Sequence, residues 1–142
     1  MQTETMTLKI TRTPKQQKSF DAVVSGIHSS AIEGGSYGIG YWCEIVSYKW
    51  DEKDDTKFKS VIQMQEENEN DKDKRISKLR KYTIDRDLIV LGIKRIAMGE
   101  IKVNEAYVQK CGALLLTGDA DMDGDDADVI VQAGIFNEVI FG

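Results

Sequence analysis

Apolar residues recur at two different spacings along the chain, and the changes between them divide it into predicted helices and strands. From residue 19 to residue 31 the spacing of three and four predicts a helix with one buried face, made of Phe20, Val23, Val24, Ile27 and Ala31. Thr13-Pro14 opens this helix, because proline at the first helical position loses no hydrogen bond. Gly34 or Gly35 supplies the left-handed residue that ends it.

The spacing becomes alternate over residues 41–50 and again over residues 57–64, which predicts two strands. Because both faces of the first segment carry apolar groups, we expect it to be a central, well-covered strand. The polar residues 51–55 form the turn of a hairpin, and the second segment is its antiparallel return strand. Three weaker patterns complete this part of the chain: a third short strand at 82–84, an edge strand or ordered arm at 1–12, and a mobile loop at 66–74.

Three further helices are predicted in the second half of the chain. Asp85 caps the first, which ends near Gly99, and Asn104 caps the second over residues 105–116. Asp125 or Asp126 starts the third. This order of elements predicts an α+β fold with an N-terminal helix, a small antiparallel sheet with a hairpin, and C-terminal helices packed on it. Residues 1–142 have the length of a single domain.

The last predicted helix is apolar on nearly every side. Such a helix either lies at the centre of the core or is shared with a partner chain. Two or three strands offer little sheet to cover it, so we expect a homo-oligomer with Ile135, Phe136 and Ile140 at or near the contact. The alternative is a helix wholly buried within one subunit.

Composition narrows the class of protein. The apolar runs are too short to span a membrane and the N-terminus has no apolar signal segment, so we expect a soluble protein without membrane contact. A net charge of −5 argues against nucleic-acid binding, which needs clustered Lys and Arg. Two cysteines and one histidine do not supply a tetrahedral metal site, and we expect neither a metal nor a cofactor.

One acidic segment imitates a calcium loop. Asp119, Asp121, Asp123 and Gly124 stand at the first, third, fifth and sixth positions of an EF-hand. The twelfth position, which holds the bidentate glutamate of such loops, is Ile130. We therefore expect a turn and a helix N-cap there, with room for no more than a weak, partly hydrated ion.

The candidate ligand site is the segment of residues 33–42, which we call the glycine joint. It holds four glycines, which let the backbone approach a ligand, among aromatic side chains that can stack on a base or ribose. Basic side chains of the helix after Asp85 suit an anionic group. The candidate ligand-binding residues are Glu33, Gly34, Gly35, Tyr37, Tyr41, Trp42, Arg86 and Arg95. The alternative is a tight helix-to-strand connection with its aromatics folded onto the core.

The sequence contains no visible catalytic set. His28 has serines near it on the same predicted helix, but nucleophilic catalysis needs a nucleophile, a base and a third group that orients the base. We therefore expect a satisfied or half-exposed histidine, and a protein that is not an enzyme.

Two motifs carry a resemblance to a known family. Ala31-Ile-Glu33-Gly-Gly35 with Gly40-Tyr-Trp42 forms the first, and the ending from Ala127-Asp128 through Gln132, Phe136 and Glu138 to Gly142 forms the second. Thr83-Ile-Asp85 followed by Gly92-Ile93 adds to them. Together they resemble a family of small proteins of tailed phages and prophages, over roughly residues 20–142, with Ser36 to Ile39 lengthening the joint.

The resemblance implies a phage accessory protein, and the chain looks like the Thoeris anti-defence kind of sponge protein. Such proteins form oligomers and sequester cyclic ADP-ribose-type immune signals without cleaving them. We therefore expect a phage-encoded, non-enzymatic protein of the infected bacterial cytoplasm that binds a cyclic nucleotide or cyclic ADP-ribose-type signal. The alternative is an inhibitor of a host defence enzyme, whose acidic clusters at 66–73 and 119–128 imitate a phosphate backbone.

Overall fold

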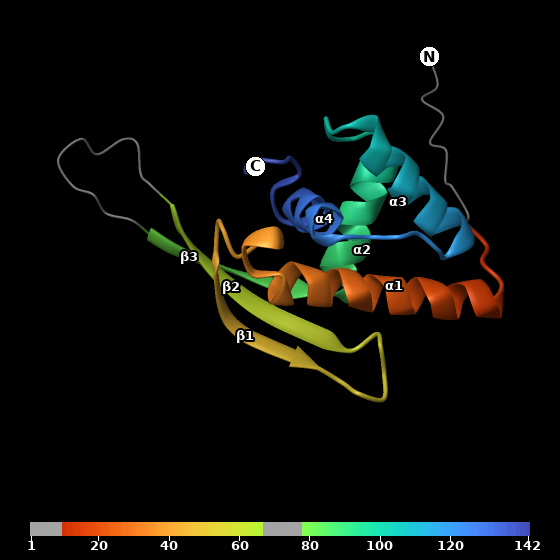
Figure 1. The fold of residues 1–142 in the computed structure, drawn as a ribbon, viewed down its shortest axis with the longest axis horizontal. Coiled ribbons are helices and arrows are strands. Elements are labelled where there is room, and N and C mark those ends of the chain that lie inside the picture. The colour runs from red at the N-terminus through yellow and green to blue at the C-terminus, as the bar shows by residue number, and fades with distance from the viewer. Residues whose placement is uncertain (1–9, 67–77) are drawn as a thin grey trace, which may run out of the picture.

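The computed structural model describes residues 10–66 and 78–142 and confirms the α+β fold class, with four helices and a small antiparallel sheet (Figure 1). The elements are α1 Pro14–Glu33, the short 3-10 helix η1 Gly35–Tyr37, β1 Glu44–Trp50, β2 Phe58–Glu66, β3 Lys78–Asp85, α2 Arg86–Ala97, α3 Glu105–Thr117 and α4 Gly124–Phe136. The predicted arm at 1–12 and loop at 66–74 fall almost entirely outside the described residues.

Side-chain caps start α1, α2 and α3 where the sequence predicts, whereas α4 begins at Gly124 with Asp123 as its cap, and not at Asp125 or Asp126. Thr13 and Gln16 form a reciprocal capping box at the start of α1, with Pro14 as the first helical residue. The carboxylate of Asp85 accepts from the backbone N–H of Leu88 at α2, and the side chain of Asn104 caps α3. These contacts are local, which is why they can be recognised in the sequence.

The sheet has the order β1-β2-β3, and both strand pairs are antiparallel. The predicted hairpin is confirmed, but the prediction that residues 41–50 form the central strand is wrong, because β2 is central and β1 lies at an edge. A shift in register between Ile45 and Ser47 breaks the alternation of β1. Val46 and Trp50 are exposed, so apolar residues on both faces did not mean coverage on both faces.

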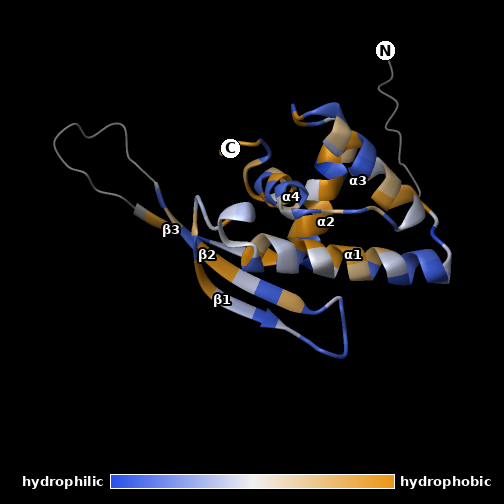
Figure 2. Cartoon of the chain, viewed as in Figure 1, coloured by the Kyte–Doolittle hydropathy of each residue, from blue (hydrophilic) through white to orange (hydrophobic). Residues whose placement is uncertain are grey.

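Helix α4 is buried within the helical layer. Its residues from Asp126 to Gly134 are all buried, α1 and α2 pack directly against it, and α3 packs on α2. The crossing with α2 is close: a Cβ atom at Gly92 would overlap the carbonyl oxygen of Ile130, and one at Gly134 would lie 2.6 Å from that of Leu88. Figure 2 shows the strongly hydrophobic α2 that faces this helix.

The burial of α4 changes the argument for a homo-oligomer. The premise that the chain cannot cover its last helix is wrong, and the alternative of burial within one subunit describes α4. Of the three residues expected at a contact between subunits, Ile135 and Phe136 are half-buried and Ile140 is exposed. The homo-oligomer stays a prediction. Although α4 is apolar, no helix in the described part of the chain has both the length and the apolarity needed to cross a membrane.

His28 joins α1 to the sheet. Its ring stacks on Phe58 at 4.3 Å between centroids and meets Tyr48 edge-on at 5.1 Å. Its Nε2 shares a hydrogen bond of 2.6 Å with the hydroxyl of Ser60. Only 1% of the residue is exposed, and burial lowers the pKa of the imidazole to about 4. His28 is thus a neutral, satisfied core residue.

The buried histidine predicts a stability that depends on pH. Between pH about 6.5 and about 4 the unfolded chain binds a proton at His28 that the folded chain does not, so the free energy of unfolding falls by about 3 kcal/mol as pH falls. His28→Gln, which keeps a hydrogen-bonding group near Ser60 but does not titrate, should lose this part of the pH dependence. Urea denaturation of both proteins across this range measures the difference. Parallel pH profiles for the two proteins would contradict the assignment.

Candidate functional site

The glycine joint is folded tightly against two helix ends. A Cβ atom at Gly34 would lie 2.5 Å from the carbonyl oxygen of Ser30, and one at Gly38 would overlap that of Ala31, both on α1. Gly35 has a positive φ of 56°. At the start of α4, a Cβ atom at Gly124 would overlap the carbonyl oxygen of Tyr37. The close approach of the backbone therefore explains the glycines, as expected for the alternative of a tight helix-to-strand connection.

The joint delivers two aromatic side chains to a buried carboxylate. Asp128, on α4, is 8% exposed, and its Oδ1 accepts from the indole Nε1 of Trp42 at 2.8 Å and from Nε2 of Gln132 at 2.9 Å. Its Oδ2 accepts from the hydroxyl of Tyr41. Burial and the hydrogen bond to this carboxylate raise the pKa of Tyr41, so the phenol stays protonated. We call these four residues the Asp128 network.

Gln132 extends the network to the last residues of the chain. Its Oε1 accepts from the backbone N–H groups of Ile140 at 2.8 Å and Phe141 at 2.9 Å. The ring of Phe141 stacks on Trp42, with 5.1 Å between centroids and 6° between planes. One turn of α4 therefore fixes both the glycine joint and the C-terminal segment, which are far apart in the sequence.

A pocket of about 640 Å³ lies beside the Asp128 network. Four segments line it, and they contribute Ser36 and Tyr41 from the glycine joint, Lys102, Val103, Asn104 and Tyr107 from the start of α3, Asp125, Asp128 and Val129 from α4, and Val139, Phe141 and Gly142 from the C-terminal segment. Burial, and then the charge of Asp125, raise the pKa of the Tyr107 hydroxyl. The pocket offers phenol rings, carboxylates, an amide and one ammonium group, a mixture suited to a small polar ligand with a flat ring.

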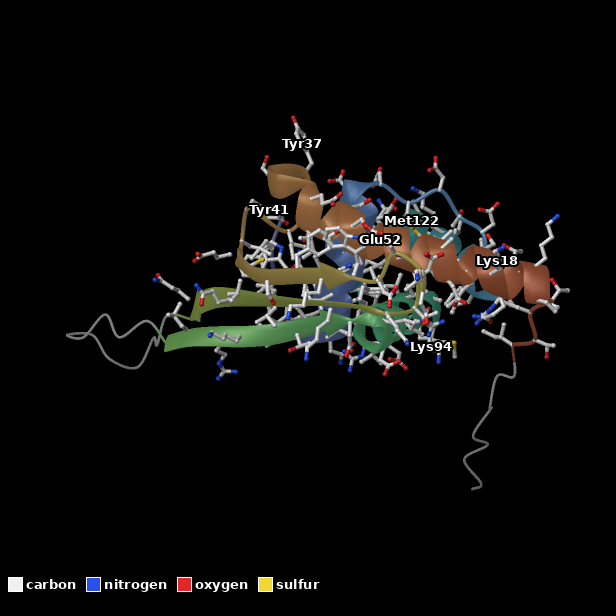
Figure 3. All side chains as sticks on the ribbon, turned by 90° about the horizontal axis from the view of Figure 1, so that it is seen from below. Lys18, Tyr37, Tyr41, Glu52, Lys94 and Met122 are labelled. Atoms are coloured by element: carbon white, nitrogen blue, oxygen red, sulfur yellow. The ribbon has the colours of Figure 1, made fainter. Side chains whose placement is uncertain are left out.

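The predicted residues of the glycine joint are divided by the structure. Tyr41 lines the pocket, and Trp42 lies behind it in the Asp128 network. Tyr37 is 82% exposed and points away from the body of the protein in Figure 3. Glu33, at the end of α1, accepts from the hydroxyl of Tyr48 at 3.1 Å, and neither it nor Gly34 lines the pocket. Of the candidate residues in the joint, only Tyr41 therefore lines the pocket, together with Ser36, which was not a candidate.

The two predicted arginines do not join this pocket. Nη2 of Arg86 lies 2.7 Å from the carboxylate of Asp21, between α2 and α1. Nη1 of Arg95 donates to the carbonyl oxygens of Ala133 and Gly134, at 2.9 and 3.0 Å, near the end of α4. Both guanidinium groups bind acceptors within the chain. These acceptors are distant in sequence, so the positions of the arginines along the chain do not reveal them.

Sequence reasoning missed most of the polar residues that line the pocket. Asn104 was interpreted as a helix-start residue, Asp125 as a helix-start residue and part of the acidic cluster at 119–128, and Lys102 and Tyr107 were not considered. One signal was available for Asp128, since a carboxylate in a helix that is otherwise apolar must find donors. Lys102 and Tyr107 have no such signal, because the fold alone brings them to the pocket.

The acidic segment before α4 forms the predicted turn and cap. Asp123 and Asp126 make a reciprocal capping box, and Asp126, 4% exposed in its side chain, also lies 2.8 Å from Nζ of Lys110 on α3. Across the described residues, no three side chains of His, Cys, Asp or Glu are grouped to hold a metal ion. The carboxylates near the start of α4 thus stabilise its N-terminus.

The two cysteines are core residues. Cys111 is buried and Cys43 is half-buried against the core, and burial raises the pKa of both thiols to about 12. A thiol held protonated in this way is a poor nucleophile and a poor metal ligand.

No family model, curated protein or solved structure matches this chain. Function is therefore inferred from the pocket and from the motifs in the sequence. Residues of both motifs, Tyr41 and Trp42 in the first and Asp128 and Gln132 in the second, meet in the Asp128 network.

The Asp128 network predicts an uneven response to the loss of carboxylates on α4. Asp128→Ala leaves the donors of Tyr41, Trp42 and Gln132 without their acceptor and should lower the free energy of unfolding by about 3 kcal/mol. Asp125→Ala removes the same charge from the exposed first turn of α4 and should cost less than about 1 kcal/mol. Urea denaturation compares them. Equal losses would show that the network contributes nothing to stability.

Calcium should leave the stability of the protein unchanged. Ile130 replaces the bidentate carboxylate, and Asp123 and Asp126 are engaged as caps, so no high-affinity loop remains. Melting temperatures measured in millimolar calcium and in excess chelator should agree, with magnesium at the same ionic strength as the control. A calcium-specific rise of several degrees would contradict this account of the acidic segment.

Proposed function

We propose that this chain is a non-enzymatic, phage-encoded anti-defence protein that sequesters a small cyclic nucleotide or cyclic ADP-ribose-type signal in the cytoplasm of the infected bacterium. The observation that supports this most is the pocket beside the Asp128 network, which combines aromatic, amide, carboxylate and ammonium groups from four segments. The resemblance of the two motifs to phage accessory proteins supports the biological setting.

Each type of group in the pocket has a counterpart on a nucleotide. The rings of Tyr41 and Tyr107 can contact a base, and the amide of Asn104 can bond to its edge. Asp125 can accept from ribose hydroxyls, and Lys102 can meet a phosphate. The ligand would be held by many modest contacts, which suits retention of an intact molecule.

The lining of the pocket also favours binding over turnover. None of the twelve lining residues is a histidine or a cysteine. His28 is buried between α1 and the sheet, outside this lining. Ser36 therefore has no imidazole base beside it among the lining residues, and a hydroxyl without such a base is a weak nucleophile.

A second candidate is inhibition of a host defence enzyme through acidic mimicry. Asp119, Asp121 and Asp123 are exposed along the connection between α3 and α4, and Asp125 is exposed in the first turn of α4. The cluster at 66–73 is outside the described residues apart from Glu66. Charge reversal at Asp119, at Asp121 and across the cluster at 66–73, which leaves the helix cap, Asp125 and the Asp128 network in place, separates the two candidates. It should abolish suppression of defence by a mimic, and it should spare retention of a signal by the pocket.

Retention of an intact ligand tests the proposed function. Purified protein is incubated with cyclic mononucleotides, cyclic ADP-ribose isomers and cyclic oligonucleotides, freed of unbound ligand and heated, and the released molecules are identified by mass spectrometry. We expect one of them to be recovered unchanged, with the retained amount reduced severalfold by Tyr107→Ala, which removes a ring from the pocket.

Tyr37→Ala is the matched control, because it removes an equally large ring that projects into solvent. It should leave retention unchanged. Recovery of a chemically altered product would contradict the proposed binding function and indicate an enzyme. Failure to retain any of the signals would overturn the proposed nucleotide ligand.

A further inference from the structure

We infer that the pocket selects a ligand that carries a single anionic group at one end and a hydroxyl or amino donor at the other, joined by a flat ring. For nucleotides this means a preference for one phosphate over several. Among the signals of the proposed function it favours a cyclic mononucleotide, which has one phosphate, over cyclic ADP-ribose isomers and cyclic oligonucleotides, which have at least two. The inference rests on the proposed function and names the ligand class of the same site.

Two opposite charges line the pocket without a partner. Lys102 and Asp125 make no ion pair or side-chain hydrogen bond within the part of the chain that the structure describes, and they do not pair with each other. The neighbouring buried carboxylates are engaged, since Asp128 has three donors and Asp126 has Lys110. The two unpartnered charges are therefore the ones available to a ligand.

The charges stand on different walls of the pocket. Lys102 comes two residues before the N-cap of α3, Asn104, whereas Asp125 lies in the first turn of α4. Tyr107, from the first turn of α3, lines the same pocket. A ligand with a flat ring can contact this phenol while its two ends meet the ammonium and the carboxylate, and charge-assisted hydrogen bonds are the strong ones in such a site.

The balance of charge limits how many phosphates the ligand can carry. Two carboxylates, Asp125 and Asp128, line the pocket against one ammonium group, and the exposed Asp121 and Asp123 lie just before α4. The first phosphate of a ligand can form an ion pair with Lys102. Each further phosphate finds no second cation in the lining and is repelled by the carboxylates.

Titration calorimetry with adenosine, AMP and ATP tests this preference. We expect AMP to bind at least about tenfold more tightly than adenosine or ATP. Lys102→Met should reduce the affinity for AMP to that for adenosine. Asp125→Asn should reduce the affinity for AMP and increase the affinity for ATP. Lys94→Met and Asp87→Asn make the same changes in net charge at exposed positions of α2 outside this pocket, and they should bind as the wild type does.

Two analogues identify which hydrogen-bond donor of the ligand binds the carboxylate of Asp125. A dideoxy-AMP that lacks both ribose hydroxyls, and IMP, which lacks the amino group, should be compared with AMP, and one of them should lose affinity only while Asp125 is present. Tighter binding of ATP, equal behaviour of the pocket variants and the α2 controls, or no loss with either analogue would overturn the inference and leave the proposed function standing. Failure of all three adenine ligands to bind would also overturn it, whereas the proposed function is judged separately by the retention of cyclic signals.

Discussion

A carboxylate buried in an apolar helix must be met by hydrogen-bond donors, and the arrangement of the whole pocket depends on how this chain meets that need at Asp128. Two of the donors come from consecutive residues of the glycine joint, Tyr41 and Trp42, and the third from Gln132 one turn along α4. Because the side chain of Gln132 also binds the backbone of the C-terminal segment, one helical turn fixes two walls of the pocket. Burial of α4 among the other helices makes this anchor rigid.

This anchor gives a physical reason for two features that look functional in the sequence. The glycines of the joint let its backbone lie against the end of α1 and the start of α4, and so they position the aromatics rather than contact a ligand. The pocket is then formed by side chains from α3, α4 and both anchored segments. Its polar groups divide into those that hold the structure, such as Asp128, and those such as Lys102 and Asp125 that have no partner within the described chain.

Local interactions were predictable from the sequence, and long-range ones were not. Thr13, Asp85 and Asn104 bond to backbone groups two or three residues away, so their helices begin where expected. The edge position of β1 depends on pairing with β2 and on an irregularity near Val46, which no spacing of residues reveals. The bond between Trp42 and Asp128 spans 86 residues, and the acceptors of Arg86 and Arg95 are likewise distant in sequence. Of the candidate residues only Tyr41 lines the pocket, whereas Tyr107, Lys102 and Asp125 were not candidates.

Hydrogen exchange of the two tryptophan indoles tests the anchor most directly, because the chain contains only two tryptophans and the structure places them in opposite environments. The indole N–H of Trp42 is bonded to Asp128, whereas Trp50 is 59% exposed on the edge strand. In NMR spectra of the folded protein, the indole proton of Trp42 should exchange slowly, at a rate close to that of the most protected amides of α4, and that of Trp50 should exchange at once. Rapid exchange at both indoles would contradict a buried network centred on Asp128.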